Sequence, residues 1–124
     1  MKTIIVLLAA VFTVFTAQSQ KTVWAKTITG NASLVSKNHK VCTDKENNFY
    51  ITANFTAEIA FGDIILKSKN TTGPTDAFIA KIDPEGKKVL WGVQITGFGN
   101  IEAKNICSDQ DMNVYVVGSF EDKT

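Results

Sequence analysis

The chain repeats one sequence pattern at a nearly constant interval. Residues 42–55 read CTDKENNFYITANF, and residues 107–120, which start 65 positions later, read CSDQDMNVYVVGSF. A second matching pair, WAKTITG at residues 24–30 and WGVQITG at residues 91–97, is separated by 67 positions. A repeat of this kind predicts an architecture in which one unit cannot bury its own surfaces and neighbouring units complete the core.

The first 19 residues have the features of a secretory signal peptide. Lys2 provides a positive charge, residues 4–14 form an apolar stretch interrupted only by Thr13, and residues 16–19 supply the small side chains of a cleavage site. We therefore predict cleavage after Ser19, a mature domain of residues 20–124, and a periplasmic, cell-surface or extracellular location. The apolar stretch is too short for a comfortable membrane span and no second one follows, so we predict no transmembrane segment.

The mature chain is close to electrical neutrality and has no arginine. Without Lys2, 12 lysines balance 12 acidic residues. Nucleic-acid recognition relies on a basic surface and on the bidentate guanidinium group of arginine. Nucleic acid is therefore not an expected partner.

The two cysteines occupy equivalent positions in the repeat. An exported protein with two cysteines is a candidate for a disulfide bond. Cys42 and Cys107, however, should be related by the rotation between units, which usually separates equivalent α-carbons by more than the roughly 7 Å that a bridge allows. We predict two buried free thiols, with no catalytic or zinc-binding role.

The mature sequence has the pattern of β-strands, with short alternating or clustered apolar runs bounded by Gly, Pro, Asn and Asp. Residues 76–82 and 88–95 predict one hairpin, joined by the turn Asp-Pro-Glu-Gly at residues 83–86. In the first strand Phe78, Ala80 and Ile82 should share a face. In the second, the shared face should contain Val89, Trp91, Val93 and Ile95.

The repeated pattern predicts a second type of hairpin, present once in each unit. Residues 41–43 and 49–55 flank one polar turn, and residues 106–108 and 114–120 flank its counterpart. Residues 61–66 predict one more short extended segment, followed by a polar loop at 68–75. A complete unit thus covers about residues 41–97, with a second unit begun at about 105. Four strands joined by short turns are the arrangement of a propeller blade.

Several of these elements resemble the bacterial β-propeller repeat called SBBP, and the resemblance covers residues 23–120. The matching positions are Asp109, Asn113, Tyr115, Gly118-Ser119-Phe120, Phe61-Gly62, residues 76–81, Asp83-Pro84, Gly86 and Leu90-Trp91. The first unit departs from the family pattern at Asn47-Asn48, where Gly-Asn is usual, and at residues 53–55, where Gly-Ser-Phe is usual. The resemblance implies an exported propeller and implies nothing uniform about activity.

The resemblance also suggests a role for the start of the mature chain. Residues 23–29 match the last strand of a unit, and we expect them to close a ring by completing its final blade. The fold class expected is all-β, with one complete unit of four antiparallel strands plus partial units that leave the ring incomplete. A partial sequence or truncated gene is the favoured explanation of the incomplete ring, and an oligomer of short chains is the alternative.

No catalytic, cofactor-binding or metal-binding residue is predicted. Asp44-x-Glu46-x-Asn48 and Asp109-x-Asp111-x-Asn113 present oxygen atoms at alternate positions, but they lack the glycine and the final glutamate of the known calcium loop. A hairpin turn is the better interpretation of both. Residues 97–100 (GFGN) are expected to be a loop between blades, because no helix signal follows them. His39 has no catalytic signature around it, and Trp24 and Trp91 are expected to pack between blades.

The sequence therefore predicts an exported, non-catalytic repeat protein, a surface or extracellular binding or scaffold module for carbohydrate or protein. The alternative is the N-terminal part of a propeller enzyme acting on polysaccharide, with catalytic residues in blades outside this chain. A third possibility is a purely structural filler within a larger surface protein.

Overall fold

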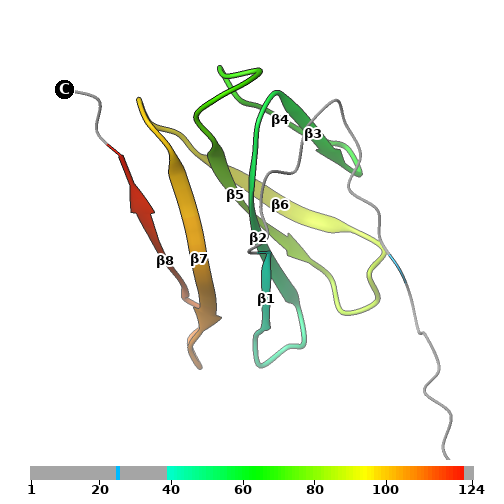
Figure 1. The fold of residues 1–124 in the computed structure, drawn as a ribbon. Helices are drawn as coiled ribbons and strands as arrows, with labels where there is room; N and C mark the ends of the chain where they lie inside the picture. The colour runs from blue at the N-terminus through cyan, green and yellow to red at the C-terminus, as the bar shows by residue number, and fades with distance from the viewer. Residues whose placement is uncertain (1–24, 26–38, 122–124) are drawn as a thin grey trace, which may run out of the picture.

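The computed structural model describes Ala25 and residues 39–121, and the regular structure in this part of the chain is all β (Figure 1). No helix long and apolar enough to span a membrane occurs among these described residues. The strands are β1 (Lys40–Thr43), β2 (Phe49–Phe55), β3 (Glu58–Phe61), β4 (Ile64–Lys67), β5 (Asp76–Ile82), β6 (Val89–Ile95), β7 (Ile101–Ser108) and β8 (Val114–Phe120).

The first unit forms one antiparallel sheet of four strands, in the order β1-β2-β5-β6. The sequence analysis predicted both of its hairpins, β1–β2 and β5–β6, to within a residue of their observed bounds. β2 and β5 are paired along their whole length, from Phe49 opposite Ile82 to Phe55 opposite Asp76. This sheet is the predicted four-stranded blade.

The chain between β2 and β5 differs from the prediction. Residues 61–66 were expected to form a single extended segment, but they contain a reversal of direction between β3 and β4. Gly62 has a φ of 61° at this turn, a conformation that costs little only without a Cβ. β3 and β4 therefore form their own hairpin, which is inserted into the blade and does not join its sheet.

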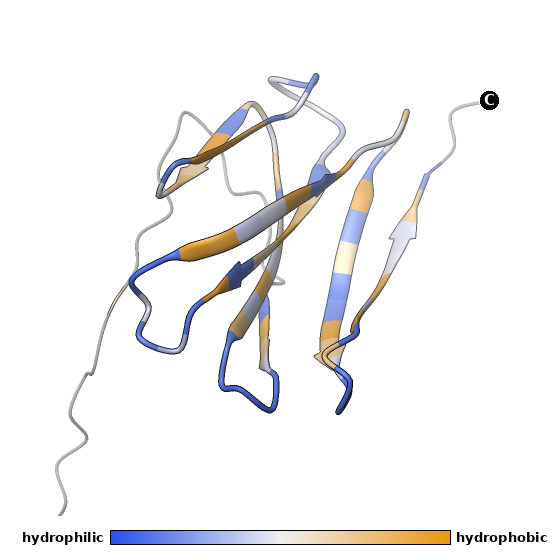
Figure 2. Ribbon diagram, turned by 180° about the vertical axis from the view of Figure 1, so that it is seen from behind, coloured by the Kyte–Doolittle hydropathy of each residue, from blue (hydrophilic) through white to orange (hydrophobic). Residues whose placement is uncertain are grey.

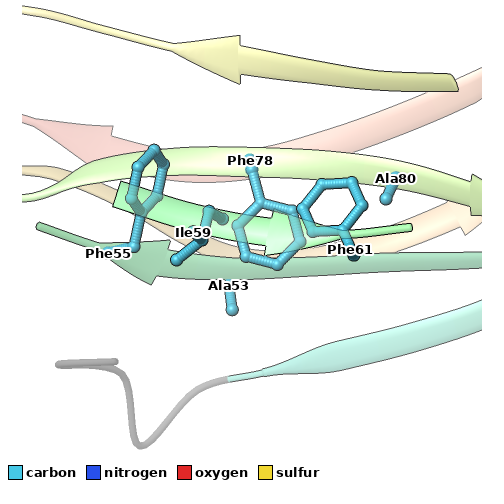
Figure 3. Packing of buried hydrophobic residues seen from close by; sticks show 6 residues of the cluster. All are labelled: Ala53, Phe55, Ile59, Phe61, Phe78 and Ala80. Carbon is cyan, nitrogen blue, oxygen red and sulfur yellow. The ribbon is translucent and has the colours of Figure 1, made fainter. Parts of the chain in front are cut away.

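The β3–β4 hairpin covers one face of the blade and encloses the main hydrophobic core. Figure 3 shows the ring of Phe78 between Phe55 and Phe61, with centroid distances of 6.0 and 5.3 Å. The alternating side chains of β2 and β5 supply one side of the core and β3 supplies the other, since residues i and i+2 of a strand share a face. The buried cluster consists of Ala53, Phe55, Ile59, Phe61, Phe78 and Ala80.

A β-bulge changes the predicted face of one residue in β6. The register shifts between Lys81 and Ile82, so that Trp91 lies opposite Lys81 while Val89 lies opposite Ile82. Val89 consequently packs against the Phe78 cluster rather than sharing a face with Trp91. The strict alternation assumed from the sequence fails here because a bulge adds one residue to one strand. The prediction was therefore wrong for Val89.

The second unit lies against the opposite face of the blade and consists of the β7–β8 hairpin (Figure 1). β7 begins at Ile101, five residues earlier than predicted. The longer strand pairs with the whole of β8, with a bulge between Ala103 and Asn105. At this bulge a Cβ on Gly118 would lie 2.1 Å from the carbonyl oxygen of Glu102, so glycine is required there. Ala53, at the equivalent position of β2, has no partner on the shorter β1.

The turns of the β1–β2, β5–β6 and β7–β8 hairpins lie at one end of the molecule. Thr43 and Ile82 both pair with Phe49, which places the first two turns together. The hydroxyl of Ser108 donates to the carbonyl oxygen of Thr43 at 2.8 Å, so the β7–β8 turn lies beside the β1–β2 turn. Figure 2 shows these turns as hydrophilic tips of strands in which hydrophobic residues alternate. We call this end of the molecule the turn end.

The predicted signal peptide at residues 1–19 lies outside the described residues. The predicted closing strand at residues 23–29 also lies outside them, apart from Ala25.

Candidate functional site: the repeated acidic turn and the cleft between units

The first copy of the repeated turn is organised by one buried carboxylate, that of Asp44. Its Oδ1 accepts the backbone N–H groups of Glu46 and Asn48 at 2.9 and 3.0 Å. The side-chain amide of Asn48 donates to Oδ2 at 2.9 Å, and the hydroxyl of Tyr50 donates to the same oxygen at 2.9 Å. Asp44 therefore fixes the turn and ties it to the adjoining strand.

Lys81, on β5, completes this cluster from the neighbouring strand. Its Nζ lies 3.2 Å from Oδ2 of Asp44 and 5.1 Å from the centre of the Tyr50 ring. Trp91 of β6 also packs against Tyr50, with the two ring centroids 5.9 Å apart. The register explains the assembly, because Tyr50, Lys81 and Trp91 lie opposite one another on adjacent strands. We call Asp44, Asn48, Tyr50 and Lys81 the closed cluster.

The closed cluster is a stable ionic arrangement. Burial alone would raise the pKa of Asp44, but the hydrogen bonds from Asn48, Tyr50 and Lys81 outweigh it and hold that pKa well below the usual range. The pKa of Lys81 is raised by its contacts with Tyr50 and Asp44, against the opposing effect of burial. Burial and the Asp44 carboxylate raise the pKa of Tyr50, against the effect of Lys81. Asp44 and Lys81 are therefore charged at neutral pH, and neither resembles a poised acid or base.

The second copy reproduces the same hydrogen bonds 65 residues later. Oδ1 of Asp109 accepts the N–H groups of Asp111 and Asn113, both at 2.9 Å. Oδ2 accepts the side-chain amide of Asn113 and the hydroxyl of Tyr115, both at 2.9 Å. We call Asp109, Asn113 and Tyr115 the open cluster. The repeat seen in the sequence is thus a repeat of atomic structure.

The backbone of the two turns is also repeated, although one side chain differs. Asn47 has a φ of 62°, and Met112, its counterpart, has a φ of 65°. Asparagine tolerates this left-handed conformation, whereas methionine adopts it at a cost. The turn geometry is therefore imposed by the Asp-x-x-x-Asn frame rather than by the residue at its fourth position.

The two clusters differ in what covers them. Tyr50 is 1% exposed and Tyr115 is 54% exposed. β5 and β6 flank the closed cluster within the sheet, and the second unit lies against this face of the blade, whereas β8 pairs only with β7 among the described residues. In this part of the chain Asp109 forms no ion pair with a lysine. Its hydrogen bonds, chiefly those from Asn113, still lower its pKa.

The amide of Asn54 joins the two units. Its Nδ2 donates to the carbonyl oxygen of Ile101 at 3.0 Å, and its Oδ1 accepts the N–H of Ala103 at 3.0 Å. Thr75 binds the same carbonyl through its hydroxyl at 2.9 Å. The departure from the SBBP pattern at Asn54 therefore has a structural use, since the amide presents a donor and an acceptor on separate atoms to two backbone groups of β7, whereas the shorter side chain of serine carries a single oxygen.

An open cleft of about 470 Å³ lies between the two units, beside β8. The first unit contributes Ala77 and Ile95 to its wall, and the second contributes Val116, Gly118 and Phe120. Glu102 and Glu121 also line the cleft, but Glu102 pairs with Lys104 at 3.6 Å and Glu121 accepts a hydrogen bond from Asn100 at 2.9 Å. The cleft is mainly apolar.

The thiols of Cys42 and Cys107 are both free, as predicted. Their predicted burial was wrong, since Cys42 is half-buried and Cys107 is exposed. Burial raises the pKa of Cys42, and the nearby Cys107 raises it further. A raised pKa disfavours the thiolate, which is the nucleophilic form. Cys107 lies opposite Tyr115, which is likewise exposed.

The structure also places the other residues that the sequence analysis singled out. The carboxylates of both Asp-x-x-x-Asn turns accept N–H and O–H donors, which confirms the hairpin-turn interpretation. Among the described residues no group of three or more His, Cys, Asp or Glu side chains could hold a metal ion. Residues 97–100 connect the first unit to the second, as predicted. Trp91 contacts Tyr50 of its own blade, and Trp24 lies outside the described residues.

Sequence reasoning missed the roles of Lys81 and Asn54. Both depend on contacts between strands that are far apart in the chain. The signal for Lys81 was present, however, as a lone lysine within the apolar run of residues 76–82. A charged residue in a central strand requires a partner of opposite charge.

Comparison with known proteins identifies one similar repeat protein. The chain is 30% identical over 105 residues to an uncharacterized WD repeat-containing protein of Acanthamoeba polyphaga mimivirus, and the match covers 79% of this chain. The chain spans 7% of the length of that relative. No family model matches the chain, and no solved structure gives a significant match. The similarity to a repeat protein agrees with the internal repeat, while membership of the SBBP type stays a prediction.

Proposed function

We propose that this chain is part of an exported, non-catalytic β-propeller repeat protein of the SBBP type, which serves as a binding or scaffold module for another protein. The single observation that carries the proposal is the reproduction of the Asp44 hydrogen bonds around Asp109, in hairpins that occupy successive units. Units repeated at this level of detail form a rigid array whose equivalent loops point in one direction.

A structural use of the charged groups favours a scaffold over an enzyme. Asp44 and Lys81 neutralise one another, and the carboxylates beside the cleft have partners. General acid or base catalysis needs a group whose pKa is tuned towards the working pH. The shifts at Asp44 and Lys81 are in the opposite sense.

The turn end is the proposed binding face. It carries the exposed residues Lys45 and Glu46 of the first turn, with Gln110 and Asp111 of the β7–β8 turn on one side of them and Glu85 of the β5–β6 turn on the other. Mixed charges on rigid loops suit a protein partner, because electrostatic complementarity gives specificity.

The proposal is tested by site-directed photo-crosslinking on the full chain. A photoreactive side chain is placed at Lys45 on the turn end, or at Ile65 on the exposed side of the β3–β4 hairpin as the matched control. The labelled proteins are incubated with isolated cell-envelope proteins of the source organism. We expect one discrete adduct from position 45 and none from position 65. Equal adducts from both positions would contradict a binding turn end.

Two further measurements test the remaining parts of the proposal. N-terminal sequencing of the exported product should give Gln20 as its first residue, and an uncleaved product would contradict export by a signal peptide. Incubation of the purified chain with polysaccharides should release no new reducing or unsaturated ends. If such ends were released at a rate proportional to the protein concentration, the protein would be an enzyme and the scaffold proposal would be wrong.

A further inference from the structure

β6 is the last strand of the blade, and one of its edges has no partner strand among the described residues. The sheet order β1-β2-β5-β6 pairs β6 with β5 on one side only. We propose that this edge binds the same edge of a second copy of the chain, antiparallel and across a two-fold axis, so that two blades join into one continuous sheet. The contact lies away from the turn end, and the inference does not depend on the proposed function.

Further units of the repeat would not pair with this edge. Residues 96–100 lead from β6 into β7, which lies against one face of the blade and does not extend its sheet. The β3–β4 hairpin packs against the opposite face and forms a sheet of its own. Units of a repeat array stack on their neighbours in this way. The outer edge of β6 therefore points out of the stack of units.

β6 lacks the side chains that keep an edge strand from pairing. Its sequence, VLWGVQI, has no charged residue and no proline. Natural proteins protect exposed edges with such residues or with a bulge. β6 has a bulge only near its beginning, opposite Lys81 and Ile82 of β5. Residues 91–95 pair regularly with β5, so alternate residues of this segment direct their backbone groups away from the sheet in a regular pattern.

This edge is complementary to itself when two copies run antiparallel. A register centred on Val93 places that residue opposite Val93 of the second copy, and Trp91 opposite Ile95 of the second copy. These side chains share one face of β6, because alternate residues of a strand point to the same side. Aromatic and β-branched side chains form favourable cross-strand pairs. Gly92 and Gln94, on the other face, bring no charge into the contact.

The charges around β6 favour the antiparallel arrangement. Lys87 and Lys88 are exposed and directly precede the strand, whereas residues 96–101 after it carry no charge. Antiparallel pairing places the two lysine pairs at opposite ends of the contact, about 30 Å apart for a rise of about 3.4 Å per residue. That separation is several times the screening length of about 8 Å at physiological salt. Parallel pairing would instead bring the lysines together.

Two-fold pairing limits the assembly to two copies. Both chains use the same edge, an isologous contact, so neither β6 edge is left for a third copy. The whole chain has 13 basic and 12 acidic residues, so net charge adds little repulsion between copies. One pair of short strands is a small contact compared with a standard stable interface. We therefore expect a weak dimer that dissociates on dilution.

The test uses the full chain and begins with sedimentation velocity over a wide range of protein concentration. We expect a reversible equilibrium between monomer and dimer, with no larger species. Hydrogen exchange of the unmodified chain then locates the contact. The amides of residues 91–95 should exchange more slowly at high concentration than at low concentration, and the exchange of β2 should not change.

Charge substitutions at the centre of the register test whether the occupant is a second copy. Val93 is 51% exposed, so the monomer can accommodate lysine or glutamate there. Val93→Lys alone and Val93→Glu alone should each weaken dimerisation about tenfold, because like charges then lie opposite one another. An equimolar mixture of the two variants should dimerise again, since opposite charges meet. Val41→Lys, at a 62% exposed position on β1 at the other side of the sheet, is the matched control and should dimerise normally.

Several results would overturn the proposal. A chain that stays monomeric at every concentration, or that grows beyond a dimer, would remove the two-fold contact. Exchange at residues 91–95 that is independent of concentration would do the same, whatever the variants show. Association that is blocked by Val117→Lys on β8 and not by Val93→Lys would place the contact on another edge. Failure of the mixed Val93 variants to dimerise would show that Val93 does not meet its own copy.

Discussion

Replacing the aspartate in each copy of the repeated turn measures how much the burial of the first copy adds to the free energy of unfolding. Asp44→Ala and Asp109→Ala remove the same chemical group from the same hydrogen-bond frame. The first change also leaves Lys81, Tyr50 and Asn48 without their common acceptor inside the blade. The second leaves its donors accessible to water.

The structure sets the size of the difference. Removal of one partner from a buried ion pair costs about 3–5 kcal/mol, because the remaining charge is left without compensation. The side chain of Asp44 is fully buried and that of Lys81 is 15% exposed. We therefore expect Asp44→Ala to cost about 3 kcal/mol, at the lower end of that range. Asp109→Ala should cost much less, because its exposed donors exchange one partner for water.

Urea unfolding followed by tryptophan fluorescence measures both variants, since Trp91 lies beside Tyr50 in the closed cluster. The free energy of unfolding is obtained by linear extrapolation, with the slope compared between proteins to verify that the unfolded states are alike. Equal losses for the two variants would refute the reasoning, since coverage by β5 and β6 would then contribute nothing. A third variant, Lys81→Met, should recover part of the stability of Asp44→Ala, because it removes the uncompensated charge.

Further consequences of the structure can be measured on the same protein. Because the folded pKa of Asp44 lies below its ordinary value of 3.8, the unfolded state binds the proton first, so the contribution of Asp44 to stability should be fully present above about pH 5 and be lost progressively as the pH falls below that. Acid titration of the unfolding free energy should show a shallower fall for Asp44→Ala. Gly92→Ala should lose about 1–3 kcal/mol in urea unfolding, since a Cβ would lie 2.9 Å from the ring of Phe61, and an unchanged midpoint would contradict this packing. Met112→Gly should raise the thermal midpoint, with a gain of about 1 kcal/mol from relief of the left-handed backbone, whereas a lower midpoint would show that the methionine side chain contributes more than its backbone costs. Asn54→Ser should cost about 1–3 kcal/mol and expose the amides of β7 to hydrogen exchange, and unchanged β7 protection would show that Asn54 does not hold the units together.

Local pattern was sufficient to predict most of the strands. Alternating apolar residues at 76–82 and 49–55, bounded by Asp, Asn, Pro and Gly, predicted the central pair β2 and β5. The β3–β4 hairpin was missed because four-residue strands are too short to show a period, although Gly62 marked the turn. The face of Val89 was missed because a bulge leaves no clear mark in a sequence that alternates on either side of it.

The candidate site was predictable in part. The Asp-x-x-x-Asn segments were recognised as hairpin turns, and the hydrogen bonds to Asp44 and Asp109 confirm that both segments form such turns. The junction at Asn54 was read only as a departure from a family pattern. Its function depends on the backbone of β7, 47 residues away from Asn54 at Ile101, and that separation leaves no local signal.

The sequence by itself determined that the chain repeats, that its units are built from short antiparallel strands, and that an aspartate opens each repeated turn. These properties follow from local chemistry, since side-chain alternation and turn formation involve neighbouring residues. The tertiary structure alone decided that the two aspartates differ. Asp44 is buried against Lys81 because β5 returns beside β2, whereas Asp109 faces solvent because β8 has no such neighbour in the described chain. Equal sequences thus acquire unequal energies from the strands that pack beside them.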